Sequence, residues 1–344
     1  LAKIPELRVL GRNSAAALKS AKDRRATAQQ LKVTAFLAGT VRKSGNQLRI
    51  TAQLLNTDDD ALLWSEVYDR EMREIFGMQT DLAEKVADRL NVKLSDTVRQ
   101  RLALKPTKDL EAYQLYLEGR YFWSTRTSRG VASAIEFFQQ AIQKDSNYAQ
   151  AYAGLADCYS SWEGLAANAD GVVKAKENAE NAVRLGPNVG EAHATLGFVR
   201  ENLYGDWQGA EMEFKRALEL DPNNASVHAW YGIHLARMGQ YEAGIREARL
   251  AQELDPLSSL RSWVLCWVLT AGRQYDAAIA QFENNLRLPP SQPARHRVGD
   301  CYFYRGLYEE GIAAFRKAAL SHGDDPEKVA QRYDSLREAY VKSG

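Results

Sequence analysis

The five histidines are the side chains of this sequence best suited to proton transfer or metal binding. They are His193, His228, His234, His296 and His322. A zinc site needs ligands at short spacing, such as His-x-x-x-His, and no such spacing occurs here. His193 and His228 fall at the same position of two successive sequence repeats, described below, so we expect both to pack between helices. The sequence therefore predicts no metal site.

Two short segments could be taken for ligand-binding loops. Between Gly39 and Gly45, Lys43 and Ser44 precede the second glycine. A phosphate-binding loop instead has Gly-Lys-Ser/Thr in that order before a helix, so a hairpin turn is the better interpretation. The run Asp58–Asp60 lacks the other ligands of a calcium loop and indicates a solvated turn. Because no nucleophile elbow, kinase signature or dinucleotide fingerprint occurs, we predict neither an enzyme nor a cofactor-binding protein.

Charge and hydropathy exclude further classes. The 45 Lys and Arg residues nearly balance the 44 Asp and Glu residues, so no global positive field is available to hold nucleic acid. The most apolar stretch, Trp263–Thr270, is shorter than the roughly 18 residues of a membrane-spanning helix. Cys158, Cys266 and Cys301 form no Cys-x-x-Cys pair and indicate buried thiols in a reducing cytoplasm. Since the chain opens at Leu1 without Met or a signal-peptide pattern, we expect it to be part of a longer protein.

Prolines and aromatic residues recur along the chain with one period. Pro222, Pro256 and Pro290 are 34 residues apart, in the similar contexts Leu-Asp-Pro-Asn, Leu-Asp-Pro-Leu and Leu-Pro-Pro-Ser. An aromatic series runs in phase with them at Trp207, Tyr241, Tyr275 and Tyr308. Two series with the same period indicate an internal repeat.

Each repeat has the pattern of two helices. Apolar residues at helical spacing predict a first helix after each proline turn. These first helices are predicted at Gly190–Asn202, Ala225–Met238, Ser259–Ala271 and Gln292–Tyr304. A break containing glycine then leads to a second helix in which small and large residues alternate, as in Ala210, Phe214 and Ala217. Small residues let two helix backbones approach, and the large residue fills the remaining space.

This unit resembles the tetratricopeptide repeat, whose 34 residues carry small side chains at the eighth, twentieth and twenty-seventh positions and proline at the thirty-second. Gly197, Ala210 and Ala217 occupy the first three of these positions. The resemblance implies an all-α solenoid, a right-handed superhelix of about six helix pairs, over residues 105–325. The first two repeats are irregular in length. Residues 326–344 are predicted to form a capping helix at the open end.

The resemblance also implies a binding face. In tetratricopeptide proteins the first helices line a concave channel, and Trp, Tyr and Arg often carry the binding energy of protein interfaces. The channel positions of this sequence are Tyr113, Tyr116, Arg120, Trp123, Phe198, Ile233, Arg237, Trp263, Trp267, His296, Phe303 and Tyr304. We therefore expect a protein partner, bound as a peptide or helix. The alternative is that Trp263 and Trp267 pack against neighbouring helices.

Residues 1–104 lack the 34-residue period and are predicted to form a separate domain, here called the head. Three strands are predicted at Ala35–Lys43, Gln47–Asn56 and Ala61–Asp69, joined by short turns. Helices predicted at Arg24–Leu31 and Phe76–Leu90 flank this antiparallel meander. The head is therefore expected to be an α/β or α+β domain. Residues 1–105 carry 19 Lys and Arg against 13 Asp and Glu, a net charge of +6.

The string Leu37–Ile50, followed by Leu63–Glu66 and Tyr68–Arg70, resembles the TolB-type N-terminal domain of bacterial multidomain regulators. In that family the domain precedes tetratricopeptide repeats, and a winged-helix, adenylate cyclase or kinase domain lies upstream. The resemblance implies the sensory or scaffolding arm of a bacterial regulator, with an N-terminally truncated head. The alternative function is self-association, in which a homodimer forms through the aromatic surface or an exposed sheet edge and dimerises an upstream effector.

Overall fold

The computed structural model describes residues 1–20, 24–125, 127–161, 170–285, 298–322 and 324–343. The chain divides into two compact units. Unit 1 comprises Leu1–Val9 and Ala21–Asn224, and unit 2 comprises Leu10–Ser20 and Ala225–Gly344. Residues 1–20 are therefore shared between two units that otherwise follow each other along the chain.

The head in unit 1 contains a three-stranded antiparallel sheet in the order β1-β2-β3. Its strands are β1 (Ala35–Ser44), β2 (Gln47–Asn56) and β3 (Leu62–Glu71), which confirms the predicted meander. The β1 strand ends one residue later than predicted, and β3 begins one residue later and ends two residues later. The turn between β1 and β2 is tight because Gly45 adopts a left-handed φ of +56°. Since the described sheet is wholly antiparallel, α+β is the appropriate choice of the two predicted classes.

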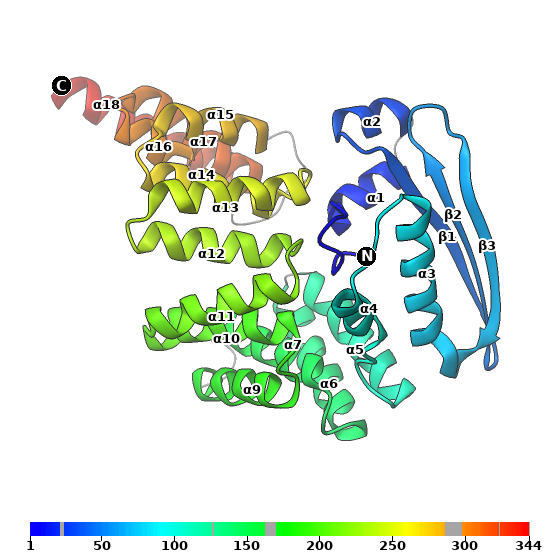
Figure 1. Ribbon diagram of the computed structural model, residues 1–344. Coiled ribbons are helices and arrows are strands. Elements are labelled where there is room, and N and C mark those ends of the chain that lie inside the picture. Colours follow the sequence, from blue (N-terminus) through cyan, green and yellow to red (C-terminus); the bar gives the residue numbers. More distant parts are fainter. Residues whose placement is uncertain (21–23, 126, 162–169, 286–297, 323, 344) are drawn as a thin grey trace. The chain divides into compact units, whose positions relative to one another are not determined.

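Helix α3 (Ile75–Arg89) covers one face of this sheet (Figure 1). Its Met78 and Val86 pack on Leu54 and Trp64, so the alternating apolar side chains of the strands are buried on that face. The 3-10 turn η1 (Met72–Glu74) joins β3 to α3, and the short helices α2 (Arg24–Gln30) and α4 (Asp96–Ala103) complete the head. In α4 the Ser95 side chain accepts a hydrogen bond from Val98 N, which caps the helix N-terminus.

The described residues of both units form six successive helix pairs and a terminal helix. Unit 1 contains α5 (Leu110–Ser124), α6 (Ser128–Lys144), α7 (Ala149–Ser160), α9 (Gly171–Leu185), α10 (Gly190–Tyr204) and α11 (Trp207–Leu220). Unit 2 contains α1 (Arg12–Ser20), α12 (Ala225–Arg237), α13 (Tyr241–Leu254), α14 (Ser259–Ala271), α15 (Tyr275–Asn285), α16 (Val298–Tyr304), α17 (Tyr308–His322) and α18 (Pro326–Ser343). The predicted helix pairs and terminal helix are thus present. The predicted segment 292–297 lies outside the described residues.

Small residues set the distance between paired helices, as the sequence predicts. Phe138 of α6 is fully buried, and a Cβ atom placed on either Gly119 or Gly154 would lie 2.6 Å from its ring. In the pair α12 and α13, where Ala248 replaces the phenylalanine, the backbones themselves approach. A Cβ on Gly244 would lie 2.7 Å from the Gly232 carbonyl oxygen. The space between two helices is therefore filled either by a large side chain or by the close approach of the two backbones at glycine.

Polar contacts attach the head to the repeats within unit 1. Arg101 of α4 donates to the carbonyl oxygens of Glu219 and Leu220 at 3.1 Å, where α11 ends. Asn223, in the turn that follows, donates to the carbonyl oxygens of Ile4 at 2.9 Å and Leu7 at 3.0 Å. These side chains satisfy main-chain acceptors that a helix end and an irregular segment leave unpaired.

A comparable contact holds α1 within unit 2. The buried Asp255 carboxylate accepts hydrogen bonds from Asn13 Nδ2 at 2.8 Å and from the amide and hydroxyl groups of Ser14 at 3.1 and 2.7 Å. Gly11 N donates to the Leu254 carbonyl oxygen at 2.6 Å. Asp255 thus acts as an N-terminal cap for a helix that lies 241 residues earlier in the chain.

Candidate functional site

The first-helix positions predicted to bind a partner fall in both units. In unit 1 they centre on Tyr116 and Arg120 of α5. Arg120 forms an ion pair with Glu191 of α10, and the Tyr116 hydroxyl donates to the same carboxylate at 3.2 Å. Burial raises the pKa of the Tyr116 hydroxyl, so it remains a neutral donor. This polar cluster links the first helices of two repeats.

The other predicted positions of unit 1 have packing roles. Trp123 is only 9% exposed and belongs to the core around Phe138. Tyr113 packs edge-on against Phe76 of α3, with ring centroids 4.9 Å apart, and its hydroxyl accepts from Gln79 at 3.1 Å. Tyr113 therefore contributes to the attachment of the head. Phe198 is half-buried on α10.

In unit 2 the predicted residues Trp263, Trp267 and Tyr304 line a cavity of about 280 Å³. Its walls come from α14, from the start and middle of α15, and from α16. The remaining lining residues are Thr270, Ala271, Arg273, Tyr275, Phe282 and Asp300. We call this space the α14–α16 cavity. Its volume is sufficient for one large side chain of a ligand.

The aromatic walls of this cavity are held in place by ring contacts. Tyr304, which is 65% exposed, stacks on Tyr275 with centroids 5.9 Å apart and an interplanar angle of 18°. Arg237 of α12 lies over the Trp267 ring at 5.8 Å from its centroid, within the range of a cation–π contact. The Trp263 indole nitrogen is buried without a hydrogen-bond partner among the described residues. The lining of the cavity thus combines aromatic rings with the charged side chains of Arg273 and Asp300.

Three predicted positions lie elsewhere. Ile233 packs beside the core of unit 2. Phe303 contacts Tyr308 and Phe315 of α17, with ring centroids 5.5 and 5.8 Å away, and so packs within its own helix pair. His296 lies outside the described residues. Conversely, Tyr275 and Arg273 line the cavity although no first-helix position points to them; Tyr275 belongs to the aromatic series of the repeat.

The repeated histidines are buried between the helices of their own repeats. His193 Nδ1 lies 2.6 Å from a Glu213 carboxylate oxygen, and His228 Nδ1 lies 2.6 Å from a Glu247 carboxylate oxygen. One repeat later, Ser262 and Gln281 form the equivalent hydrogen bond at 3.0 Å. Burial acts to lower the pKa of His193, but its hydrogen bonds to Glu213 and to the Pro187 carbonyl outweigh burial and raise that pKa above 6.5.

The cysteines are poor nucleophiles in this environment. Cys158, Cys266 and Cys301 are all buried and free of disulfides. Burial raises the pKa of the Cys266 and Cys301 thiols, which keeps them protonated at neutral pH. The Cys301 sulfur of α16 lies 2.9 Å from the hydroxyl of Thr270, a residue of α14 that lines the cavity.

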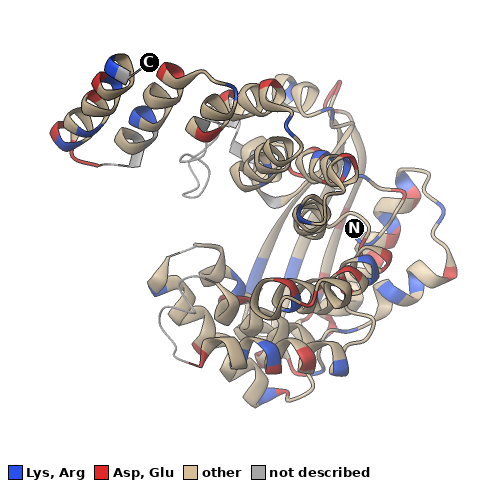
Figure 2. Cartoon of the chain, turned by 90° about the vertical axis from the view of Figure 1, so that its left-hand side faces the viewer, with Lys and Arg blue, Asp and Glu red and all other residues tan. Residues whose placement is uncertain are grey.

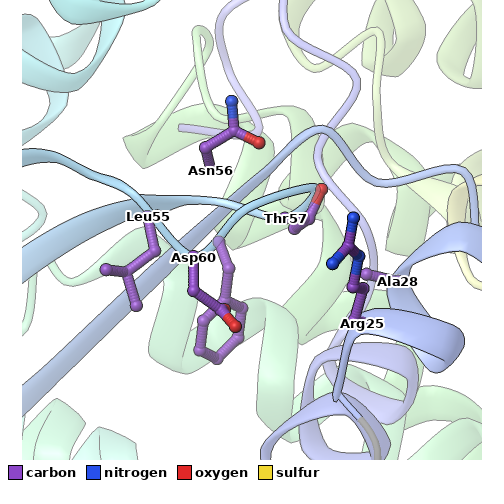
Figure 3. Close-up of a pocket in the computed structure, with 7 residues that line it drawn as sticks. Arg25, Ala28, Leu55, Asn56, Thr57 and Asp60 are labelled. Atoms are coloured by element: carbon purple, nitrogen blue, oxygen red, sulfur yellow. The ribbon is translucent and has the colours of Figure 1, made fainter.

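The head has a small hollow between α2 and the end of β2, shown in Figure 3. Its lining residues include Arg25, Thr57 and Asp60, but it is too small to hold a water molecule. In the adjacent turn, the Asp59 carboxylate accepts from Ala61 N at 3.0 Å, so this acidic side chain stabilises the turn. This hollow therefore offers no volume for a ligand.

Among the residues that the structure describes, no group of three or more His, Cys, Asp or Glu side chains is placed to hold a metal ion. No helix within these residues combines the length and the apolar character needed to cross a bilayer.

Residues 205–259 match the family model described as tetratricopeptide repeat. The chain carries tetratricopeptide repeats. Over 202 residues it is 29% identical to "Putative adenylate cyclase 3" of Rhizobium meliloti (strain 1021), covering 57% of this chain and 34% of that protein. Over 217 residues it is 26% identical to "Superkiller complex protein 3" of Mus musculus, covering 62% of this chain and 14% of that protein. The chain thus spans about a third or less of these relatives.

Among solved structures, the chain is similar to a tetratricopeptide repeat protein from Parabacteroides merdae ATCC 43184. The sequence identity is 16%, and the TM-score is 0.47. The match covers 76% of this chain and 97% of that protein.

Proposed function

We propose that this chain is a protein-binding module whose tetratricopeptide repeats hold a peptide or partner helix against the first-helix face of unit 2. The observation that carries this proposal is the α14–α16 cavity of about 280 Å³, walled by Trp263, Trp267 and Tyr304. An aromatic pocket of this kind accepts one buried anchor side chain, and such anchors dominate the binding energy of protein interfaces.

Charged side chains in and beside the lining add specificity to this aromatic pocket. Arg237 lies over Trp267, while Arg273 and Asp300 line the cavity from a loop and from α16. A ligand with an aromatic or large aliphatic anchor, flanked by polar or charged residues, would complement both parts. The half-buried aromatic residues thus provide packing for the repeats and contact area for a ligand.

Within this proposal, residues 1–104 are a TolB-like head, residues 105–325 the repeat array and residues 326–344 its cap. The module serves as the sensory or scaffolding arm of a bacterial multidomain regulator. The similarity to a relative named as a putative adenylate cyclase supports that context. The chain covers only 34% of that relative, so most of the relative lies outside the similar region. The chain would then supply binding, and other parts of the protein would supply the output.

Selection from a library of twelve-residue peptides displayed on phage, with the full chain as bait, tests this function. We expect selected peptides to share an apolar anchor and to lose about 30-fold in affinity for the Trp267→Ala variant, the loss of a hot spot of about 2 kcal/mol. Trp207→Ala is the matched control, because Trp207 lies at the start of α11 in unit 1 and is 39% exposed. Equal affinity for both variants, with helical content unchanged, would refute the proposal.

A further inference from the structure

Arg273, in the loop between α14 and α15, has a backbone conformation that arginine rarely adopts. Its φ is +58°, and among the described residues of the repeats it is the only residue other than glycine in the left-handed region. The Arg273 amide donates to the Thr270 carbonyl oxygen at 3.0 Å, and the Gln274 amide donates to the Leu269 carbonyl oxygen at 2.9 Å. This pair of hydrogen bonds ends α14 and requires a left-handed residue at position 273.

Glycine occupies the equivalent position in three other repeats. Gly205, Gly239 and Gly306 each lie two residues before the aromatic residue that begins a second helix, as Arg273 lies two residues before Tyr275. The φ angles of these glycines are +66°, +78° and +81°. Because a Cβ atom destabilises this conformation, arginine lowers the folding free energy gained at a turn where glycine would not. Backbone strain of this kind is typical of a position that serves a function other than folding.

The side chain of Arg273 lines the α14–α16 cavity. It is exposed, and it makes no hydrogen bond or ion pair with another residue that the structure describes. No contact within the repeat therefore offsets the backbone strain. The guanidinium group is instead available to a ligand in the cavity.

Two further features of the cavity favour a ligand with acidic groups. The Trp263 indole N–H is buried without an acceptor in the described part of the chain, and such a donor is destabilising unless a ligand or water pairs with it. Arg237 is exposed beside the cavity and lies over the Trp267 ring, so two guanidinium groups lie near one lining carboxylate, that of Asp300. Along the repeat helices, basic and acidic residues are otherwise interspersed (Figure 2). The excess of positive charge is therefore a property of this site.

We propose that the α14–α16 cavity selects an acidic segment of its protein partner, and that Arg273 binds the carboxylate of an Asp or Glu side chain next to the apolar anchor. This rests on the proposed function, in which the cavity holds that anchor. A guanidinium group forms charge-assisted, often bidentate hydrogen bonds with a carboxylate. The Trp263 N–H donates to an oxygen of the same segment. Arg273 thus determines specificity, in a turn where the other repeats have glycine.

The peptide library described above tests this selectivity when it is displayed through the carboxyl ends of the peptides, which leaves no free terminal carboxylate. The wild-type chain, Arg273→Gln and Arg246→Gln are used as baits in parallel. Arg246 is exposed on α13 and does not line the cavity, so Arg246→Gln is the matched control for the loss of one positive charge. We expect the wild-type chain and Arg246→Gln to enrich Asp or Glu adjacent to the anchor, and Arg273→Gln not to do so.

A selected peptide with its Glu replaced by Gln measures the contact directly. In fluorescence anisotropy, this replacement should weaken binding to the wild-type chain at least about fivefold and to Arg273→Gln by less than about twofold. The difference isolates the pairing of Arg273 with the carboxylate.

Two glycine exchanges separate the ligand from the fold. Arg273→Gly should lose the same discrimination while its thermal midpoint rises, because glycine relieves the left-handed backbone. Gly239→Arg makes the reverse change in the preceding repeat, where a Cβ atom meets nothing within 4 Å, so only the conformation is tested. It should lower the thermal midpoint and leave the selection of acidic peptides unchanged.

The possible results distinguish this proposal from the proposed function. Peptides that bind Trp267→Ala weakly but show no preference for acidic residues would overturn the role of Arg273 and leave the proposed function standing. A lower thermal midpoint for Arg273→Gly would overturn that role as well, because Arg273 would then stabilise the repeat itself. Failure to select anchored peptides, or equal binding of them by Trp267→Ala, would refute the proposed function and the role of Arg273 together.

Discussion

Replacing Gly244 by Ala tests the close approach of α12 and α13. The new Cβ atom would lie 2.7 Å from the Gly232 carbonyl oxygen and 3.1 Å from Ala236 N, so main-chain atoms on the facing helix would have to move. Overpacking of this kind costs about 1–3 kcal/mol, and contact with backbone rather than a flexible side chain favours the upper part of that range. Helix propensity opposes it, since Ala is favoured over Gly by about 1 kcal/mol. We expect a net loss of about 1–2 kcal/mol in unfolding free energy.

The matched control is Gly77→Ala. Gly77 also lies inside a helix, α3, but a Cβ atom placed there meets nothing within 4 Å. Propensity alone then acts, and the variant should gain about 0.5–1 kcal/mol. Urea unfolding followed by circular dichroism gives the global effect. Because the chain has two compact units, native-state hydrogen exchange in α12 and α13 gives the effect within unit 2.

If Gly244→Ala stabilised α12 and α13 as much as Gly77→Ala stabilises α3, main-chain contact would not limit the spacing of this pair. A loss confined to the global urea midpoint, with exchange in α12 and α13 unchanged, would also contradict the reasoning, because the strain should be local.

The pKa of His193 is raised, so its pairing with Glu213 stabilises the fold fully below about pH 6.5. This stabilisation is lost as the pH rises through the higher folded-state pKa, and Glu213→Gln should therefore flatten the pH dependence of the urea midpoint. Phe138→Ala should cost about 3–5 kcal/mol, because the ring fills the space between Gly119 and Gly154, and retention of the wild-type thermal midpoint would contradict that packing. Asp255→Ala removes the acceptor for the N-terminus of α1, so amide exchange at Ser14 should accelerate at least about tenfold while α18 remains unaffected.

The elements with strong local patterns were predictable from the sequence. The β2 strand has the predicted limits because its alternation is strict, and α14 has the predicted limits because its apolar pattern ends beside Gly272. These signals depend only on near neighbours in the chain. The helix-pair architecture followed from the 34-residue period for the same reason.

Elements fixed by distant residues were not predicted. The start of α1 depends on the Asp255 carboxylate, and no local acidic residue marks its first turn. Tyr113 matches a channel position by repeat alignment, yet it packs against Phe76 because α3 of the head covers it. Repeat alignment also points only to first helices, so Tyr275 and Arg273 were missed as cavity residues. The partner-binding role of the aromatic positions stays a prediction.

The position of Asp255 has a consequence for folding during synthesis. Its partner Ser14 precedes it by 241 residues. At about 5–20 residues per second, a ribosome needs on the order of 10–50 s to make the residues between them. Throughout that interval the nascent α1 segment has no acceptor for its first turn, and at nine residues it is too short to be a stable helix by itself. Unit 2 can therefore be completed only after most of the chain has emerged, which makes its assembly the late step in biosynthesis.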